Sequence, residues 1–107
     1  MAEKSRRRLT LEESLAADPD DAFLRYGLAL QCLREGDVAE GRERLLGLIA
    51  DHPDDQVAAY QQLGQSYLEE GDANSARKFL KLGIAKATAR GDGHAAAEMQ
   101  GLLEQTG

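Results

Sequence analysis

The hydrophobic positions of this chain recur at the three- and four-residue spacing of helices, most clearly between residues 22 and 33. Plotted at 100° per residue, this segment carries one apolar arc of roughly 220°, which only Arg25 interrupts. The arc contains Ala22, Phe23, Tyr26, Leu28, Ala29, Leu30, Cys32 and Leu33. A surface helix needs an apolar stripe of little more than about 100°. One neighbouring helix therefore cannot bury the whole arc, and part of it is a candidate binding surface.

Two further segments show helical spacing. Residues 9–18 read as a short helix that begins with a capping box of Thr10 and Glu13. Residues 92–105 place an apolar stripe on one side of a helix, formed by Ala95, Met99, Leu102 and Leu103. No segment shows the alternation of apolar and polar residues that is typical of a strand. The pattern predicts an all-α protein.

The pattern is also repeated along the chain. Residues 33–46, LREGDVAEGRERLL, return 35 residues later as LEEGDANSARKFL at residues 68–80. Just upstream, residues 18–26 match residues 52–60 after a shift of 34. A period of this length indicates stacked helical repeats.

Each repeat reads as two helices joined by a tight turn. The Gly-Asp pairs at 36–37 and 71–72 mark these turns, because glycine adopts the left-handed conformation that ends a helix and aspartate caps the next one. Pro19 and Pro53 suit the first turn of the helix that opens each repeat, where the N–H that proline lacks is not needed.

The second repeat resembles the tetratricopeptide repeat family. Its aromatic, leucine, small, aromatic, small and large apolar sites are occupied by Tyr60, Leu63, Gly64, Tyr67, Ala76 and Leu80. The first repeat departs from the pattern, because Arg25, Cys32 and Gly41 stand where an aromatic residue, a tyrosine and an alanine are usual. The resemblance covers about residues 19–90. It implies antiparallel helix pairs stacked as a short α-solenoid, with N- and C-terminal capping helices.

This reading divides the chain into a tail and one helical domain. We expect a basic, disordered tail at 1–8 and a single domain at 9–107. The domain consists of an N-terminal half-repeat helix at 9–18, repeat 1 at 19–53, repeat 2 at 54–90 and a C-terminal capping helix at 92–105.

Four glycines in the expected helices predict close helix packing, because glycine there costs about 1 kcal/mol relative to alanine. They are Gly41, Gly47, Gly64 and Gly83. Cys32 aligns with Tyr67 on the buried side of its helix, so we expect a core thiol and not a nucleophile.

Composition limits the class of partner. The chain has 19 acidic and 13 basic residues, a net charge of −6 and a pI near 4.8, which disfavours nucleic acid. Its longest apolar run, residues 45–50, is far too short to span a membrane, so we expect no membrane partner. A single cysteine cannot form a disulfide within the chain and suits a reducing compartment. We therefore expect a cytoplasmic protein.

Basic residues gather in one segment. Residues 73–91 contain five basic and no acidic residues, whereas residues 9–72 contain fifteen acidic and four basic ones. The candidate basic patch is Arg77, Lys78 and Lys81. A solvated helix face is the simpler interpretation. The functional alternative is a docking surface for an acidic partner or for the acidic half of a second copy.

The sequence shows no catalytic constellation. It has no glycine-rich phosphate loop, no HExxH and no CxxC, and His52 and His94 fall in an expected turn and an expected helix start. Paired acidic residues lack the spacing of a calcium loop. We expect no enzyme activity, no cofactor and no metal ion.

The family resemblance also implies a groove. In tetratricopeptide domains the first helix of each pair lines a concave surface that binds a peptide or a partner helix. The aligned lining residues are Phe23, Tyr26, Leu30, Leu33, Arg34, Ala58, Gln61, Gln65, Leu68 and Glu69. Relatives that hold acidic chaperone tails use lysines and asparagines at sites where this chain has Tyr26, Leu30 and Gln62, so that activity is not expected.

We therefore expect a non-catalytic scaffold that binds a protein or peptide of unknown identity. The alternative is a homodimeric regulatory or accessory subunit whose groove is filled by a second copy, and an enzyme is a distant alternative. The excess part of the apolar arc consists of Phe23, Tyr26, Leu30 and Leu33. Besides a partner or a second copy, the N-terminal segment is a third candidate to cover it, by folding Leu9, Leu11 and Leu15 across these residues.

Overall fold

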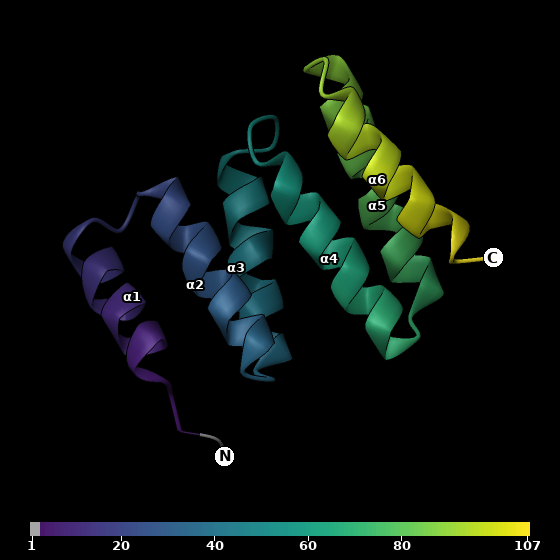
Figure 1. The fold of residues 1–107 in the computed structure, drawn as a ribbon. Coiled ribbons are helices and arrows are strands. Elements are labelled where there is room, and N and C mark those ends of the chain that lie inside the picture. Colours follow the sequence, from purple (N-terminus) through teal and green to yellow (C-terminus); the bar gives the residue numbers. More distant parts are fainter. Residues whose placement is uncertain (1–2) are drawn as a thin grey trace. The chain divides into compact units, whose positions relative to one another are not determined.

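The computed structural model describes residues 3–107, which form six α-helices joined by short turns (Figure 1). The helices are α1 (Arg6–Ala17), α2 (Ala22–Arg34), α3 (Val38–Asp51), α4 (Val57–Glu70), α5 (Ala73–Ala89) and α6 (Gly93–Glu104). The described residues contain no strand. The prediction of an all-α, helical-repeat protein is confirmed.

The chain divides into two compact units, Met1–Leu48 and Ile49–Gly107. The first unit holds α1, α2 and most of α3, and the second holds α4, α5 and α6. The expectation of one domain over residues 9–107 stays a prediction.

The N-terminal boundary differs from the expected one. Helix α1 begins at Arg6, because the hydroxyl of Ser5 accepts a hydrogen bond from the Arg8 N–H at 3.0 Å and caps the helix. The expected tail at 1–8 is therefore wrong for residues 6–8, which belong to α1, while residues 1–2 lie outside the described residues. The capping box at Thr10 is also wrong, because Thr10 lies inside α1.

The Gly-Asp turns have the predicted conformation. Gly36 and Gly71 have φ of 83° and 85°, and Asp37 and Asp72 each donate a backbone hydrogen bond of 2.9 Å to a carbonyl five residues earlier. Each aspartate side chain then accepts a hydrogen bond from the N–H three residues later. A third Gly-Asp turn, at residues 91–92, separates α5 from α6. The sequence analysis did not identify this dipeptide as a turn of the same kind.

The two prolines lie outside the helices, which corrects the prediction that they occupy a first helical turn. Helix α2 begins three residues after Pro19, where Asp21 caps it by accepting a hydrogen bond of 3.0 Å from the Leu24 N–H. Helix α4 begins four residues after Pro53. The Tyr60 hydroxyl donates a 2.8 Å hydrogen bond to the Pro53 carbonyl, so the motif tyrosine holds the turn that precedes its own helix.

The core of the first unit lies between α2 and α3. Leu28, Ala29, Cys32 and Leu45 are at most 1% exposed, which confirms the prediction that Cys32 is a core residue. A Cβ atom at Gly41 would lie 2.6 Å from Leu33 Cδ2, so this glycine is required for the close approach of the two helices.

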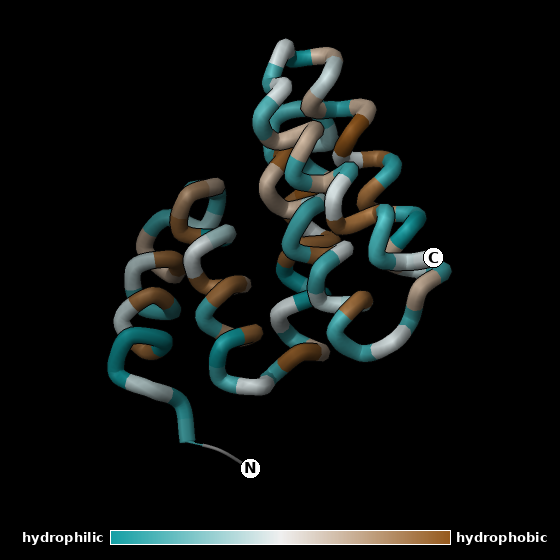
Figure 2. Tube along the Cα trace, turned by 45° about the vertical axis from the view of Figure 1, so that its right-hand side comes forward, coloured by the Kyte–Doolittle hydropathy of each residue, from teal (hydrophilic) through white to brown (hydrophobic). Residues whose placement is uncertain are grey.

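The second unit is a bundle of α4, α5 and α6, with its hydrophobic residues gathered inside (Figure 2). Its fully buried side chains include Leu63, Leu80 and Met99, and Met99 belongs to the C-terminal stripe predicted to cap the repeats. The rings of Tyr67 and Phe79 stack with their centroids 5.6 Å apart.

Glycines set the spacing of these helices too. A Cβ atom at Gly64 would lie 2.5 Å from Leu80, and one at Gly83 would collide with Tyr60 and Met99. The prediction is wrong for Gly47, where the nearest atom is a guanidinium nitrogen of Arg25 at 3.5 Å, an ordinary contact distance. Close packing therefore requires Gly41, Gly64 and Gly83.

Candidate functional site

The predicted groove residues of the first unit all lie on α2. Phe23 is 84% exposed, and Arg34 is also exposed. Tyr26, Leu30 and Leu33 are half-buried. Leu33 packs toward Gly41 in α3 and therefore belongs in part to the core. We call Phe23, Tyr26, Leu30 and Arg34 the α2 stripe.

Helix α1 packs against α2 on a side other than this stripe. Leu11 approaches Gly27, and Ser5 hydrogen-bonds to Gln31 and Glu35. At 100° per residue, Gly27, Gln31 and Glu35 lie on a helical face beside that of Phe23 and Leu30. The interpretation that the N-terminal segment folds Leu9, Leu11 and Leu15 across the stripe is thus wrong for Phe23, which no residue of 3–107 covers.

The predicted groove residues of the second unit all lie on α4. Ala58, Gln65 and Glu69 are exposed, whereas Gln61 and Leu68 are half-buried. The Gln61 side chain donates a 3.1 Å hydrogen bond to Glu98 of α6, so the last helix contacts part of this surface. The two sets of groove residues lie in different units, and the groove stays a prediction.

The predicted basic patch on α5 is not uniform. Arg77 donates hydrogen bonds to the Thr106 carbonyl at 3.0 Å and to Asn74, so it holds the C-terminal turn. The Lys78 ammonium lies 5.3 Å from the centre of the Phe79 ring. Lys81 is exposed and makes no ion pair or hydrogen bond to residues 3–107. Lys78 and Lys81 are the solvent-facing cations of the patch.

Further along α5, Lys86 has an acidic partner of its own. Its ammonium lies 2.7 Å from the Asp54 carboxylate, and this hydrogen bond raises the pKa of Lys86. The bond joins the C-terminal half of α5 to the turn before α4. This lysine is structural, which agrees with its omission from the predicted patch.

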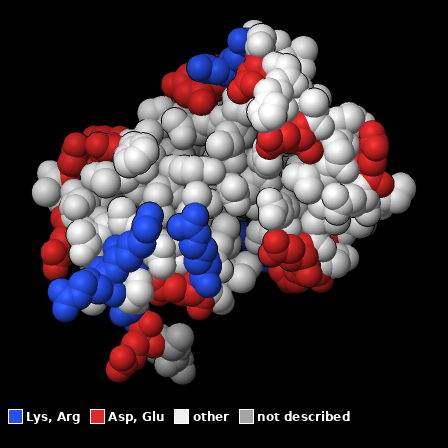
Figure 3. Space-filling model, in the orientation of Figure 1, with Lys and Arg blue, Asp and Glu red and all other residues white. Residues whose placement is uncertain are grey.

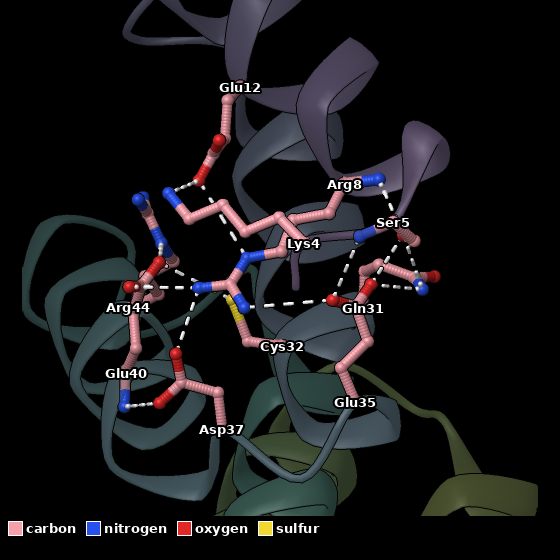
Figure 4. Close-up of polar contacts among 10 residues, drawn as sticks. All are labelled: Lys4, Ser5, Arg8, Glu12, Gln31, Cys32, Glu35, Asp37, Glu40 and Arg44. Atoms are coloured by element: carbon pink, nitrogen blue, oxygen red, sulfur yellow. Dashed lines mark hydrogen bonds and ion pairs between the residues drawn. The ribbon is translucent and has the colours of Figure 1, made fainter. Parts of the chain in front are cut away.

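A polar cluster missed by sequence analysis lies under α1 (Figure 4). At its centre is Arg8, which is 4% exposed. One guanidinium nitrogen lies 2.9 Å from Asp37 and 3.0 Å from Glu40, and another lies 3.7 Å from Glu35. We call Glu35, Asp37 and Glu40 the arginine socket.

The socket shifts the acidity of its members. The pKa of Glu40 is lowered to about 2, chiefly because Arg44 donates a hydrogen bond of 2.9 Å to it. Hydrogen bonds from Ser5 and Gln31 lower the pKa of Glu35. Burial raises the pKa of the Cys32 thiol to about 11, with a further contribution from its hydrogen bond to Glu40. Glu35 and Glu40 thus carry negative charge at neutral pH beside a thiol that stays protonated.

The sequence held one signal for this cluster. Ser5 stands immediately before the helix, as a capping residue should, but the following arginines suggested a solvated tail. The carboxylates that surround Arg8 lie far from it along the chain. Arg8 and Asp37 are 29 residues apart, and the hydrogen-bonded pair Ser5 and Glu35 is 30 residues apart. Such long-range pairing is not visible in a local pattern.

An open pocket of about 360 Å³ lies in the first unit, next to the cluster. Its lining is largely apolar and comes from all three helices and the first turn: Glu12, Leu15, Ala16, Pro19, Leu28 and Arg44. Glu12 and Arg44 also contact Arg8 and Glu40 respectively, so the pocket and the socket share an edge.

The charged surface of the first unit is mixed in sign. Figure 3 shows Lys and Arg side chains over the lower ends of α1 and α2, beside acidic ones. Within residues 3–107, no group of three or more His, Cys, Asp or Glu side chains has an arrangement that could hold a metal ion. No helix in the same range combines the length and the apolar character needed to cross a membrane.

Comparisons with known proteins agree with the fold. The sequence pattern of a family described as Tetratricopeptide repeat matches residues 1–57, the segment that holds α1, α2 and α3. The chain is 34% identical over 95 residues to the TPR repeat-containing protein PA0015 of Pseudomonas aeruginosa, covering 89% of this chain and 90% of that protein. It is also similar to the solution structure of protein BPP2914 from Bordetella parapertussis, with a TM-score of 0.83, 25% identity, and coverage of 95% of this chain and 88% of the other.

Proposed function

Because the chain belongs to the tetratricopeptide repeat family, whose members generally act as protein–protein interaction modules, we propose that it binds a peptide or partner helix through the α2 stripe. In the other unit, a second candidate surface on α4 consists of Ala58, Gln61, Gln65, Leu68 and Glu69. The basic pair Lys78 and Lys81 on α5 is a separate candidate contact for acidic groups. The proposed role is that of a non-catalytic scaffold in the cytoplasm.

The observation that carries this proposal is the exposure of Phe23. A large aromatic side chain that is 84% exposed gains on the order of 1.5–3 kcal/mol when a partner buries it. Tyr26 and Leu30 lie within two turns on the same face and are half-buried, so they would continue the contact. Arg34 at the end of the stripe supplies a charged rim, which is common at interfaces.

The second candidate is a homodimer in which the stripe of one copy contacts that of another. The same exposed side chains support it, because a two-fold interface pairs one surface patch with itself. Light scattering coupled to size exclusion separates the two candidates. A dimer that becomes a monomer in Phe23→Ser supports self-association, whereas a monomer supports a separate partner.

The interaction is tested by site-specific photo-crosslinking. A photoreactive residue at position 23 should capture a protein partner, and one at position 82 serves as the control, because Leu82 is an exposed leucine of α5 in the other unit. The captured protein is then purified, and its affinity is measured for the parent, Phe23→Ser and Leu82→Ser. We expect a loss of about tenfold or more for Phe23→Ser only. Equal affinities for all three proteins would refute the stripe as the interface.

A further inference from the structure

Helix α1 is held in place by polar contacts. Arg8 is its only buried residue, while Leu9 is 46% exposed and Leu11 and Leu15 are half-buried. Most helices in proteins derive their stability from the burial of an apolar face. In α1 the one fully buried side chain is instead that of Arg8, whose guanidinium lies in the arginine socket.

The arginine socket is built for a cation. Its three carboxylates come from the end of α2, the following turn and the start of α3, and they converge on one guanidinium (Figure 4). Like charges held this close repel one another when no cation lies between them. The shape of the group matters as well, because a planar guanidinium with five donors can contact several carboxylates at once.

Arg8, which occupies the socket, leaves one of its hydrogen-bond donors unused. Arg8 Nε is buried and has no hydrogen-bond partner, and its closest carboxylate is that of Glu12 at 3.7 Å. A buried donor that is left unpaired is costly. The pocket beside the socket is a second imperfection, since about 360 Å³ of space between Leu15, Ala16 and Leu28 is not filled by α1. A larger apolar side chain at this place on the helix has room in that hollow.

We propose that the surface of α2 and α3 under α1 is a binding site for an arginine-bearing amphipathic helix of another protein, and that α1 occupies it as an internal stand-in. The partner helix carries an arginine for the socket and, three and seven residues later, large apolar side chains in the places of Leu11 and Leu15. Charge complementarity selects this partner, because the socket presents three carboxylates. The site shares no residue with the α2 stripe, so it is independent of the proposed function.

The labelling rate of the Cys32 thiol reports whether a helix covers the proposed binding site. The thiol is 0% exposed, and its sulfur lies behind the Arg8 guanidinium in Figure 4. It is the only cysteine in the chain, so a thiol reagent gives one signal. Release of α1 removes Arg8 from above the thiol and should speed its labelling.

The test uses the full chain with Arg8→Glu, which places a fourth carboxylate in the socket, and Arg7→Glu as the matched control. Arg7 is exposed on the same helix, so the control has the same change in charge. We expect Cys32 to be labelled about tenfold faster or more in Arg8→Glu than in Arg7→Glu. Circular dichroism should show that α2–α6 remain helical.

The probe for binding is a synthetic peptide of residues 3–18. Added to Arg8→Glu protein, it should restore slow labelling of Cys32, whereas the same peptide with Arg8→Glu should not. A peptide with Leu15→Phe should bind at least as tightly as the natural peptide, because the ring can enter the pocket. If the protein variant unfolds, the experiment is repeated with Arg8→Gln, which removes the charge and adds none.

Three results would overturn the proposal. The first is equal labelling of the Arg8→Glu and Arg7→Glu proteins, which would mean that α1 stays docked without its arginine. The second is a folded Arg8 variant whose Cys32 the peptide does not protect. The third is a wild-type dimer that loses protection of Cys32 on dilution, because the occupant would then be α1 of a second copy.

Discussion

The Arg8 guanidinium lies 2.9 Å from the Asp37 carboxylate, and the other oxygen of that carboxylate accepts a hydrogen bond from the Glu40 N–H at the start of α3. One side chain therefore serves both as the cap of a helix and as the anchor of α1. Because Asp37 directly follows Gly36 in the turn between α2 and α3, the position of α1 depends on the geometry of that turn. This coupling leads to predictions that separate the two roles.

Replacement of Arg8 by glutamine should destabilise the first unit. Hydrogen bonds that involve charged groups contribute about 1.5–3 kcal/mol, and the substitution also leaves three carboxylates facing one another. We expect a loss of that size in the free energy of unfolding, measured with urea. The exposed neighbour gives the control, since Arg7→Gln should change it by less than about 0.5 kcal/mol. Similar values for the two variants would show that the burial of Arg8 contributes nothing.

The double role of Asp37 can be measured by comparison with an aspartate that only caps a helix. Asp92 caps α6 by accepting a 3.1 Å hydrogen bond from the Ala95 N–H and has no ion pair in residues 3–107. Asp92→Ala should therefore cost about 1 kcal/mol, the usual value for a lost N-cap. Asp37→Ala should cost more, because it also removes a carboxylate from Arg8. In the Arg8→Gln background this excess should disappear, and an excess that persisted would contradict the coupling.

Acid should weaken the packing of α1 and α3 around the arginine socket. The pKa of Glu40 is lowered to about 2 from an ordinary value of 4.5, and that of Glu35 is lowered as well. A carboxyl with a depressed pKa adds stability above its ordinary pKa and loses it as the pH falls toward the depressed one. Labelling of Cys32 in a pulse at fixed pH should thus report progressive opening from about pH 4.5 down to pH 2. Glu40→Gln should reduce this dependence, whereas Glu43→Gln, an exposed change on the same helix, should leave it intact.

Local signals in the sequence predicted the turns and the repeat helices, and failed where distant residues decide the structure. The Gly-Asp pairs at 36–37 and 71–72 were recognised because the left-handed glycine and the capping aspartate are adjacent in sequence. The helices α2 and α4 were predicted to start at their prolines, a few residues too early. In α2 the capping residue is Asp21, which lies after Pro19. The start of α1 was missed because only the fold brings Arg8 to the socket.

For the candidate surfaces too, local patterns were predictive and contacts between distant residues were not. The periodicity of α2 predicted an apolar excess on the face of Phe23 and Tyr26, and the exposure of Phe23 agrees with it. Which part of that arc α1 and α3 would cover was not predictable, because it depends on the angle at which each helix packs. The sequence alignment could not place Gln61 beside Glu98 either, since α6 lies outside the repeated segment.

The second unit gives a test of packing that is independent of charge. Gly64 of α4 faces Leu80 of α5, and a Cβ atom there would lie 2.5 Å from this leucine side chain, which is fully buried. Alanine favours a helix over glycine by about 1 kcal/mol, while overpacking of a core costs about 1–3 kcal/mol. Gly64→Ala should therefore lower the free energy of unfolding by up to about 2 kcal/mol, because the steric cost exceeds the gain in helix propensity.

Gly101 provides the matched control, because it also lies inside a helix of the second unit but has open space around its Cβ position. With no steric cost, Gly101→Ala should raise the free energy of unfolding by about 1 kcal/mol. Urea unfolding followed by circular dichroism measures both variants under one set of conditions. Opposite signs for the two substitutions would establish that Gly64 is required by the contact between α4 and α5. A stabilising Gly64→Ala would instead mean that the two helices can separate to admit a methyl group, and the glycine of the repeat would then not set their spacing.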